Sequence, residues 1–277
     1  MTGPAGHVRE QRLVFGEVAE TYDKQRPSYP SQIVDGVLAF AGLGQDTTTP
    51  AAEVGAGTGK ASVLFAARGL ALECLEPSPA MAAVARRNLA PYGNAEVREV
   101  SFEDWRPADH SFGLVFAAQA WHWVSPEGRY AKVCRALRPG GTFAALWNTM
   151  LGHGDKRLEK AIALAYADLI ASQGGLTGAG RAGANDWVIS EIEAPGLFEP
   201  GSPTVLRTSW QRSFDTEEWI GLLTTQSDHR MLGEETRAQL FDRIRAAVDA
   251  HGGAFEADYV TVAYLARTSE AALPDET

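Results

Sequence analysis

The chain has 277 residues and a net charge of −10, since 35 Asp and Glu outnumber 25 Lys and Arg. Apolar residues make up 45% of the chain and charged residues 22%, a balance that excludes a wholly disordered protein. Because nucleic-acid binding draws most of its affinity from basic side chains at phosphates, the acidic balance predicts no nucleic-acid partner.

The N-terminal part predicts two helices. Residues 8–24 place apolar side chains at helical spacing, which is typical of an amphipathic helix. Ser31 is expected to cap a second helix over residues 32–40, because a serine hydroxyl can accept a hydrogen bond from the first helical turn. Pro27 and Pro30 separate the two helices, since the residue before a proline avoids helical geometry.

From residue 51 onward, short apolar segments alternate with helical patterns. Strands are predicted over residues 51–54, 70–75, 96–100, 112–118 and 142–147, and helices over residues 60–68, 79–89 and 129–137. The segment 112–118 is apolar throughout, as expected of a strand that is buried on both faces. This alternation predicts a parallel sheet with helices on both of its faces.

The pattern changes after Trp147. A helix over residues 155–172, a strand over 204–214, helices over 216–223 and 234–250, and a final strand over 258–266 are predicted. The glycine-rich residues 174–180 are typical of a mobile lid or linker. We therefore expect residues 148–200 to form an insertion above the C-terminal edge of the sheet, where open α/β sheets bind their ligands.

The sharpest motif is the loop Gly55-Ala56-Gly57-Thr58-Gly59, which follows a predicted strand and opens a predicted helix. Its glycines let the backbone turn tightly and come close to a ligand. The spacing does not fit a phosphate-binding P-loop, and it misses the dinucleotide pattern GxGxxG by one residue. S-adenosylmethionine is the third ligand considered for such a loop.

Two acidic residues favour a ligand that carries both adenosine and a positive charge. Glu53 lies shortly before Gly55, where a carboxylate would repel a pyrophosphate but attract the ammonium group of a methionine moiety. A charge at the end of a buried strand needs a partner; the alternative is that Glu53 only caps the loop. Glu76 ends the next strand, about 20 residues beyond the first glycine, and an acid at that distance reaches ribose hydroxyls.

Five segments follow one another along the chain: Glu53–Lys60, Glu76–Met81, Phe102–Trp105, Ala118–Trp123 and Leu137–Gly141. Together they resemble the class I S-adenosylmethionine-dependent methyltransferases. The stretch Phe15–Pro27 is similar to the small-molecule branch of that family, which includes trans-aconitate methyltransferase-like and natural-product enzymes. The resemblance covers residues 12–148 and continues more weakly over 213–266.

The resemblance implies an α/β fold class with a doubly wound, mostly parallel seven-stranded sheet of the Rossmann-like methyltransferase type, N-terminal helices and a helical cap insertion. Residues 1–150 would hold the N-terminal helices and the cofactor-binding half of the domain. Residues 151–200 would form the cap or lid, residues 201–268 would complete the same domain with strands and helices, and residues 269–277 would be a tail.

The resemblance also implies which residues bind S-adenosylmethionine. Gly55 and Gly57 would approach the methionine and the ribose, and Glu76 would hold both ribose hydroxyls. Met81 would lie near the adenine. The implied cofactor-binding residues are Tyr22, Arg26, Glu53, Gly55, Gly57, Glu76, Pro77, Met81, Ser101, Phe102, Ala118 and Gln119.

Five of these residues are implied at the methionine end, the sulfonium or the adenine edge of the cofactor. Tyr22 and Arg26 would close over the methionine end from the N-terminal helix, and Ala118 and Gln119 would lie beside the reactive sulfonium. Ser101 stands where many relatives have Asp. The side-chain contact at the adenine edge therefore departs from the family pattern.

Methyl transfer from a sulfonium needs orientation and a dry pocket more than it needs acid–base chemistry. His122 is the best candidate base, and Tyr22 is the second candidate catalytic residue, as a hydrogen-bond donor or a wall near the methyl group. The alternative for residues 121–123 is a packing motif that orients the following loop. The candidate substrate-binding residues are Trp121, Trp123, Trp147 and His229.

The predicted activity is methyl transfer from S-adenosylmethionine to a small-molecule substrate, an organic acceptor of apolar or aromatic character such as a secondary metabolite. O-, N- and C-methylation are all open. Two alternatives are kept, an NAD(P)-dependent oxidoreductase and a non-catalytic adenosine-binding module.

Cys74 and Cys134 lie in apolar sequence surroundings, so we expect reduced thiols and no metal site. The polar N-terminal sequence lacks the pattern of a signal peptide, and no apolar run approaches the ~20 residues of a membrane span. We therefore expect a cytoplasmic protein with no membrane span. Exchange of the N-terminal helix between copies is a route to a homo-oligomer.

Overall fold

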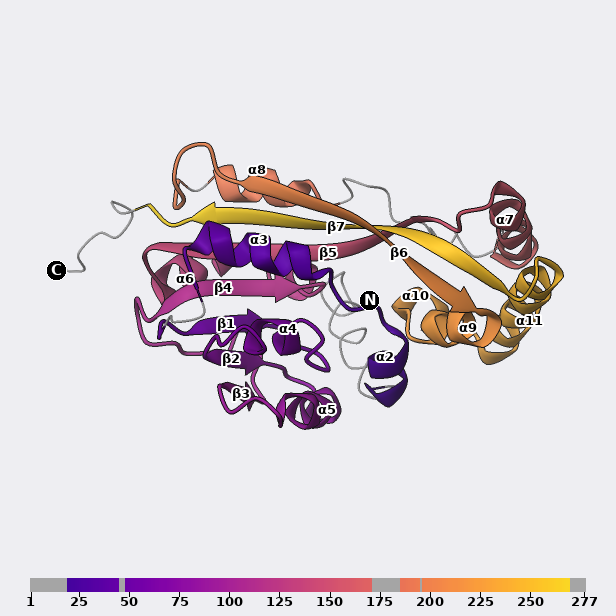
Figure 1. The fold of residues 1–277 in the computed structure, drawn as a ribbon, viewed down its shortest axis with the longest axis horizontal. Helices are drawn as coiled ribbons and strands as arrows, with labels where there is room; N and C mark the ends of the chain where they lie inside the picture. The colour runs from indigo at the N-terminus through magenta and orange to yellow at the C-terminus, as the bar shows by residue number, and fades with distance from the viewer. Residues whose placement is uncertain (1–18, 45–47, 171–184, 195, 270–277) are drawn as a thin grey trace, which may run out of the picture. The chain divides into compact units, whose positions relative to one another are not determined.

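The computed structural model describes residues 19–44, 48–170, 185–194 and 196–269 (Figure 1). The predicted helix over residues 8–24, on which the homo-oligomer expectation rests, lies mostly outside the described residues. The predicted lid over residues 174–180 lies wholly outside them, as does nearly all of the predicted tail.

Seven strands form one sheet in the order β3-β2-β1-β4-β5-β7-β6. They are β1 (Ala51–Val54), β2 (Leu72–Leu75), β3 (Ala95–Arg98), β4 (Phe112–Ala118), β5 (Leu137–Gly152), β6 (Thr204–Asp215) and β7 (Ala254–Arg267). The pairs β2–β3, β1–β2, β1–β4 and β4–β5 are parallel. In Figure 1 the arrow of β7 points the opposite way to those of β1 and β4. The predicted mostly parallel, seven-stranded sheet is therefore confirmed.

Helices connect and flank these strands. They are α2 (Ala19–Gln25), α3 (Ser31–Ala41), α4 (Ser62–Ala66), α5 (Pro79–Leu89), α6 (Arg129–Ala136), α7 (Lys156–Ile170), α8 (Trp187–Glu193), α9 (Thr216–Thr224), α10 (Ser227–Arg230) and α11 (Glu234–Ala250), with a 3-10 turn η2 (Trp121–Trp123). The predicted bounds of β1, β4, α5 and α11 are confirmed, because each is a strongly patterned run between clear turn residues. Helices α8 and α10 are too short to show a period and were not predicted.

Two expectations about element ends are wrong. The predicted cap Ser31 lies inside the first turn of α3, and Pro30 takes the N-cap position without a side-chain hydrogen bond. A strand was predicted to begin at residue 142, but β5 already begins at Leu137, before Pro139, Gly140 and Gly141. Leu137 pairs with Phe112, and the register then shifts, so the proline and glycines sit in a bulge of β5.

The described chain divides into two compact units. Unit 1 comprises residues 1–27, 149–182 and 209–260, and unit 2 comprises residues 28–148, 183–208 and 261–277. Strands β5, β6 and β7 each contribute residues to both units. The domain boundaries expected near residues 150, 200 and 268 stay a prediction.

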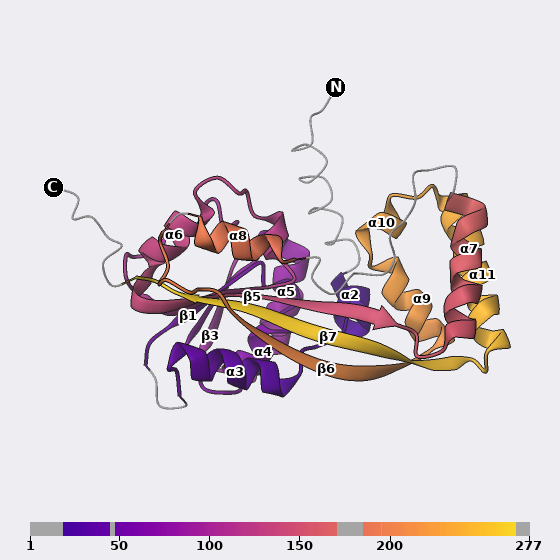
Figure 2. The same cartoon turned by 90° about the horizontal axis from the view of Figure 1, so that it is seen from above.

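Unit 2 holds the glycine loop and the parallel strands. All seven residues of β4 are buried, as the continuous apolar run predicted. Figure 2 shows α3 and α4 on one face of this part of the sheet and α6 and α8 on the other. Phe65 of α4 lies against Phe116 of β4, with 4.2 Å between ring centroids, so the helix after the glycine loop is fixed to the strand beside β1.

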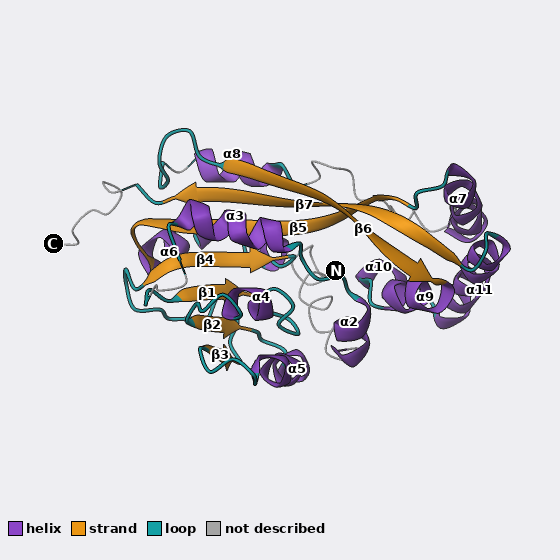
Figure 3. Ribbon diagram, viewed as in Figure 1, coloured by secondary structure: helices purple, strands orange, loops and turns teal. Residues whose placement is uncertain are grey.

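Unit 1 has a core of its own. Its helices α7, α9 and α11 (purple in Figure 3) bury the apolar side chains Leu158, Ile162, Trp219, Leu222, Leu240 and Ile244 together with Phe214 and Phe255. Helix α9 begins with a side-chain cap. Asp215 accepts a hydrogen bond from the Glu218 N–H at 2.7 Å, and Glu218 accepts one from the Asp215 N–H, which completes a capping box.

Candidate functional site

The strand order reverses direction at β1, which lies between β2 and β4. Ligands of open α/β sheets bind at the carboxyl ends of the strands at such a switch point. The loop after β1 begins at Gly55 and the loop after β4 contains Ala120. A Cβ built on Gly55 would lie 2.6 Å from the Ala120 Cβ, so these two loops are in direct contact.

The loop after β1 owes its shape to left-handed backbone. Gly55, Gly57 and Gly59 have φ values of 69°, 59° and 83°, a region that side chains disfavour. The Ala56 N–H donates to the Leu75 carbonyl at 2.9 Å and so ties the loop to β2. A Cβ on Gly57 would meet no atom within 4 Å, so the loop leaves open space at this position.

Glu76 joins the loops that follow β1 and β2. The Gly57 N–H donates to its Oε2 and the Ser78 N–H donates to its Oε1, both at 2.8 Å. The carboxylate is only 7% exposed. Two backbone donors, one from the loop after β1 and one from the loop after β2, hold the orientation of this carboxylate.

Glu53 lies at the end of β1 and is 1% exposed. The sequence argument assumed a charged carboxylate in need of a cationic partner, but the structure gives it the hydroxyl of Ser62, which donates to Oε2. The pKa of Glu53 is raised from its ordinary 4.5 to about 8, mainly by burial; the charge of Glu76 contributes to the rise, and the Ser62 hydrogen bond opposes it. The carboxyl is therefore mostly protonated at neutral pH.

The loop after β3 brings a carboxylate that sequence reasoning missed. The Ser101 hydroxyl donates to Asp104 Oδ2 at 2.8 Å, and the Asp104 N–H donates to Ser101 Oγ at 3.1 Å. Asp104 thus lies beside Ser101, the residue that the resemblance places at the adenine edge. The Phe102 side chain is buried against Trp121, and its carbonyl accepts from Lys132 Nζ.

The remaining predicted residues of this edge lie on α5 and β4. Met81 is buried in the first turn of α5, where Ser78 is the N-cap, and Pro77 is exposed. Gln119 follows Ala118 at the end of β4 with φ 58°, a conformation that is uncommon outside glycine. Its N–H donates to Leu146 O at 2.8 Å and its Nε2 to Asn148 O at 2.9 Å, so β5 holds it there.

The segment 121–123 contains one fully buried ring and two more accessible ones. Trp121 is 0% exposed and donates from Nε1 to the Tyr130 hydroxyl at 3.0 Å, so its ring packs inside unit 2. Trp123 is half-buried, and its ring lies 4.8 Å from that of the exposed residue His122. This placement agrees with the packing alternative for Trp121.

His122 lies between Trp147 and a buried cation. Trp147, at 3% exposure, donates from Nε1 to His122 Nδ1 at 3.3 Å. Although His122 reaches the surface, the groups around its ring withdraw it from water, and this desolvation, with the charge of Arg129, lowers the pKa of His122 to about 4. The ring is neutral at physiological pH.

Arg129, which sequence reasoning did not single out, is 4% exposed at the start of α6. Its guanidinium lies 5.0 Å from the ring centroids of Trp121 and Trp187 and 5.4 Å from that of Tyr130. NH1 donates to the Trp121 and Val124 carbonyls at 3.0 and 3.2 Å, and NH2 pairs with Glu191. This arginine therefore fixes the turn that carries His122.

Comparison with known proteins agrees with this geometry. A family described as a methyltransferase domain matches residues 52–145, which include the loops after β1, β2, β3 and β4. An uncharacterised methyltransferase of Mycobacterium tuberculosis H37Rv is 29% identical over 263 residues, covering 93% of this chain and 94% of the relative. The chain is a class I, S-adenosylmethionine-dependent methyltransferase.

Two further likenesses cover different parts of the methyltransferase. A candidate S-adenosylmethionine-dependent methyltransferase of Saccharomyces cerevisiae is 30% identical over 131 residues, 44% of this chain and 43% of the relative. A solved structure of a candidate type II methyltransferase from Anaeromyxobacter dehalogenans matches with a TM-score of 0.63 and 21% identity, covering 87% of this chain and 97% of that one. The second likeness extends the shared fold beyond residues 52–145.

Three residues expected at the site of the methyltransferase belong to unit 1. Arg26 donates from Nε and NH2 to the Thr225 Oγ1 and carbonyl, both at 2.9 Å, and its guanidinium lies 5.2 Å from the Tyr22 ring centroid. His229 is 0% exposed. Its Nε2 lies 2.8 Å from the Tyr166 hydroxyl, and its Nδ1 lies 2.9 Å from Asp228 Oδ1. The roles of Tyr22, Arg26 and His229 stay predictions.

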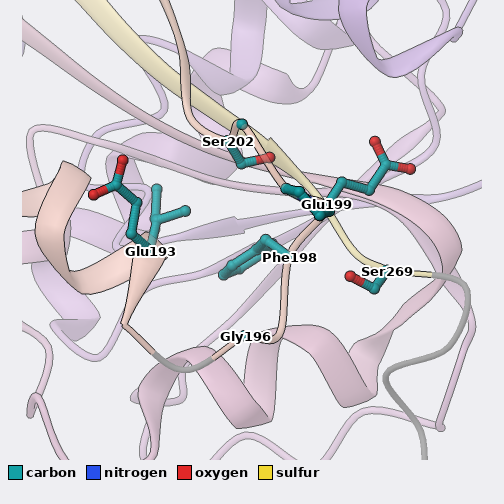
Figure 4. Close-up of a pocket in the computed structure, with 9 residues that line it drawn as sticks. Glu193, Gly196, Phe198, Glu199, Ser202 and Ser269 are labelled. Atoms are coloured by element: carbon teal, nitrogen blue, oxygen red, sulfur yellow. The ribbon is translucent and has the colours of Figure 1, made fainter.

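A cavity of about 350 Å³ lies in unit 2 where α8 ends and the chain turns toward β6 (Figure 4). It is lined by Ile192, Glu193, Gly196, Phe198, Glu199, Pro200, Gly201, Ser202 and Ser269. None of these is a residue that the sequence assigned to the site. The cavity therefore does not coincide with the predicted site residues.

Two features are absent from residues 19–44, 48–170, 185–194 and 196–269. Within these ranges no group of three or more His, Cys, Asp and Glu side chains could hold a metal ion. Among the described helices, none is long and apolar enough to cross a membrane.

The glycine loop gives the first prediction. Gly57→Ala and Gly42→Ala both place a Cβ in open space at a left-handed residue, so each should destabilise the fold by about 1–2 kcal/mol in urea unfolding. Gly42 caps α3, far from the loop in sequence. Only Gly57→Ala should weaken binding of S-adenosylhomocysteine, by about tenfold or ~1.4 kcal/mol in calorimetry. Equal affinities for the two variants would contradict this.

The second prediction concerns Glu53. Its folded-state pKa lies above the unfolded value, so the stability that the protonated carboxyl provides is present below pH 4.5 and is lost as pH rises to about 8. Glu53→Gln keeps an acceptor for Ser62 and removes this loss. The melting temperature of the variant minus that of the wild type should therefore increase from about pH 5 to about pH 8.5. The increase should be roughly 2–4 °C for each kcal/mol of unfolding free energy that the wild type loses.

The exposed Glu96 of β3 offers the matched control. Glu96→Gln should follow the wild-type melting curve at every pH. A Glu53→Gln advantage that is constant with pH would show that Glu53 is not the titrating group.

The third prediction compares two arginines of α6. Arg129→Ala leaves Glu191 and two carbonyls without their donor, and it should cost about 3–5 kcal/mol in urea unfolding. Arg135 is 56% exposed and lies 3.4 Å from Asp109, so Arg135→Ala should cost less than about 0.5 kcal/mol. Similar losses of unfolding free energy in the two variants would contradict the structural role assigned to Arg129.

Proposed function

We propose that this methyltransferase binds S-adenosylmethionine at the β1–β4 edge of unit 2 and transfers its methyl group to a small organic acceptor of apolar or aromatic character. The observation that carries the proposal is Glu76. Its carboxylate joins the Gly57 and Ser78 N–H groups beneath an open glycine loop, at the switch point of the sheet.

The residues of this edge fit the cofactor. The Glu76 carboxylate is an acceptor only and lies at the end of β2, where it would accept hydrogen bonds from the ribose hydroxyls. Gly55 and Gly57 let the methionine and ribose come close to the backbone, and the open space at Gly57 leaves room for them. The Thr58 hydroxyl is buried in the loop and has no hydrogen-bond partner among the described residues, which supports the idea that a polar ligand completes this site.

The adenine end of the proposed site involves three elements. Met81 supplies an apolar side chain from α5, and Pro77 comes from the loop before it. Ser101 and the adjoining Asp104 offer a hydroxyl and a carboxylate at the adenine edge. Phe102 contributes backbone there, because its ring is buried.

S-adenosylmethionine supplies a methyl group already bound to a good leaving group. The chain's own residues then position the cofactor and the acceptor. In the proposal Ala118 and Gln119 lie beside the sulfonium at the end of β4, and Glu53 lies beneath the loop on the methionine side.

The apolar or aromatic character of the acceptor is inferred from the side chains at the end of β4. Trp123 is half-buried and lies against His122, which reaches the surface. Trp121 and Trp147 are buried, so they would support the acceptor site from the core of unit 2. An indole face beside a polar imidazole suits an acceptor that has an apolar body and one polar group.

The binding half of the proposal is tested by calorimetry with S-adenosylhomocysteine. The wild type should bind at micromolar concentration, and Glu76→Ala should weaken binding at least about tenfold, because both ribose contacts and the tether to Gly57 are lost. Glu96→Ala, an exposed change one strand away, is the matched control. Absence of binding by the wild type at high micromolar concentration would sink the proposal.

The transfer half is tested by incubating the protein with S-adenosylmethionine and mixed metabolites, then seeking products heavier by one CH₂ group by mass spectrometry. Transfer that is lost in Glu76→Ala and kept in Glu96→Ala supports an enzyme. Binding without any transfer would favour the non-catalytic adenosine-binding module.

A further inference from the structure

The indole of Trp147 is held in one orientation inside unit 2. Its residue is 3% exposed, and the rings of Trp187 and Tyr264 lie edge-on to it, with centroids at 6.0 and 5.9 Å. The Nε1–H points to His122 Nδ1 at 3.3 Å. A side chain from β5 therefore reaches the turn that follows β4.

This contact determines which ring nitrogen of His122 carries the proton. An indole N–H only donates, so the nitrogen that faces it must present a lone pair. A neutral imidazole with a lone pair on Nδ1 carries its hydrogen on Nε2. A flipped ring would place a carbon opposite the N–H and would leave a buried donor unpaired, which is costly.

The surroundings also disfavour a second proton on His122. A proton on Nδ1 would face the Trp147 N–H and break their hydrogen bond. The Arg129 guanidinium adds a positive charge on the side of α6, and Glu191 of α8 pairs with it. In the neutral ring, Nε2 thus carries the hydrogen, and Nδ1 accepts the hydrogen bond from Trp147.

We propose that Trp147 is a positioning residue that fixes His122 as the Nε2–H tautomer, so that His122 acts on the methyl acceptor as a hydrogen-bond donor and not as a general base. The proposal rests on the proposed function for the identity of the reaction. A base needs an available lone pair, and His122 has none while Trp147 holds Nδ1. Its Nε2–H orients an oxygen or nitrogen lone pair of the acceptor.

The tautomer is read directly from the ring nitrogens of the full chain labelled with ¹⁵N-histidine, with the His122 signals assigned through His122→Gln. Between pH 6 and 8 the wild type should show a protonated Nε2 and an unprotonated Nδ1. Trp147→Phe, which removes only the indole N–H among the polar groups, should give a mixture of tautomers and a higher His122 pKa. A wild-type ring protonated on Nδ1 overturns the proposal.

Trp105→Phe is the matched control for the variant. Trp105 is a second fully buried tryptophan of unit 2, and its Nε1 donates to Glu73 at 2.6 Å, away from His122. This variant should leave the His122 tautomer unchanged. Equal effects of Trp147→Phe and Trp105→Phe would show a general loosening of the core and would overturn the specific role of Trp147.

Kinetic measurements distinguish His122 as a hydrogen-bond donor from His122 as a general base. Glutamine can present an N–H near the position of Nε2 but cannot act as a base, so His122→Gln should keep most of the kcat. His122→Ala should lower kcat by about 3- to 10-fold, the loss expected for one hydrogen bond. A general base would instead cost about 10²–10⁴-fold in both variants, and that result overturns the proposal.

Failure of this inference and failure of the proposed function give different results. The tautomer measurement needs neither cofactor nor acceptor, so it stands whatever the chain methylates. Calorimetry with S-adenosylhomocysteine on His122→Gln should match the wild type, because the donor acts on the acceptor. Weak binding by both proteins would count against the proposed function and leave the tautomer result in place.

Discussion

The close approach of two loops determines the geometry of the site. Gly55 after β1 and Ala120 after β4 leave no room for one more carbon between them. The parallel pairing of β1 with β4 brings the loops to the same edge, and the left-handed glycines let the first loop pass over the second. Glu76 then holds the open side of the loop from β2, so three neighbouring strands contribute to one surface.

Much of this surface could be predicted from the sequence because its signals are local. A glycine loop between a strand and a helix, and an acid at the end of the next strand, each lie within one short segment. The apolar run 112–118 likewise carries its own evidence of burial on both faces. The bounds of such elements and their order along the chain needed no knowledge of distant contacts.

The remaining parts of the candidate site depend on contacts between residues that are far apart in the sequence. Arg129 has an unremarkable sequence context at the start of a short helix, yet it is buried among three aromatic rings and pairs with Glu191. The pairing of Trp147 with His122 joins β5 to η2. Periodicity and spacing hold no information on such pairs, nor on the burial that raises the pKa of Glu53.

The path of the chain through its two units limits how the molecule can be divided. Each unit is assembled from three separate stretches of sequence, and three of the passages between them occur inside β5, β6 and β7. Neither unit can be excised as one continuous piece or gained by a single insertion. Residues 183–208, which hold Glu191, return to unit 2 after an excursion through unit 1, so the buried ion pair with Arg129 forms only after synthesis has passed through residues of both units.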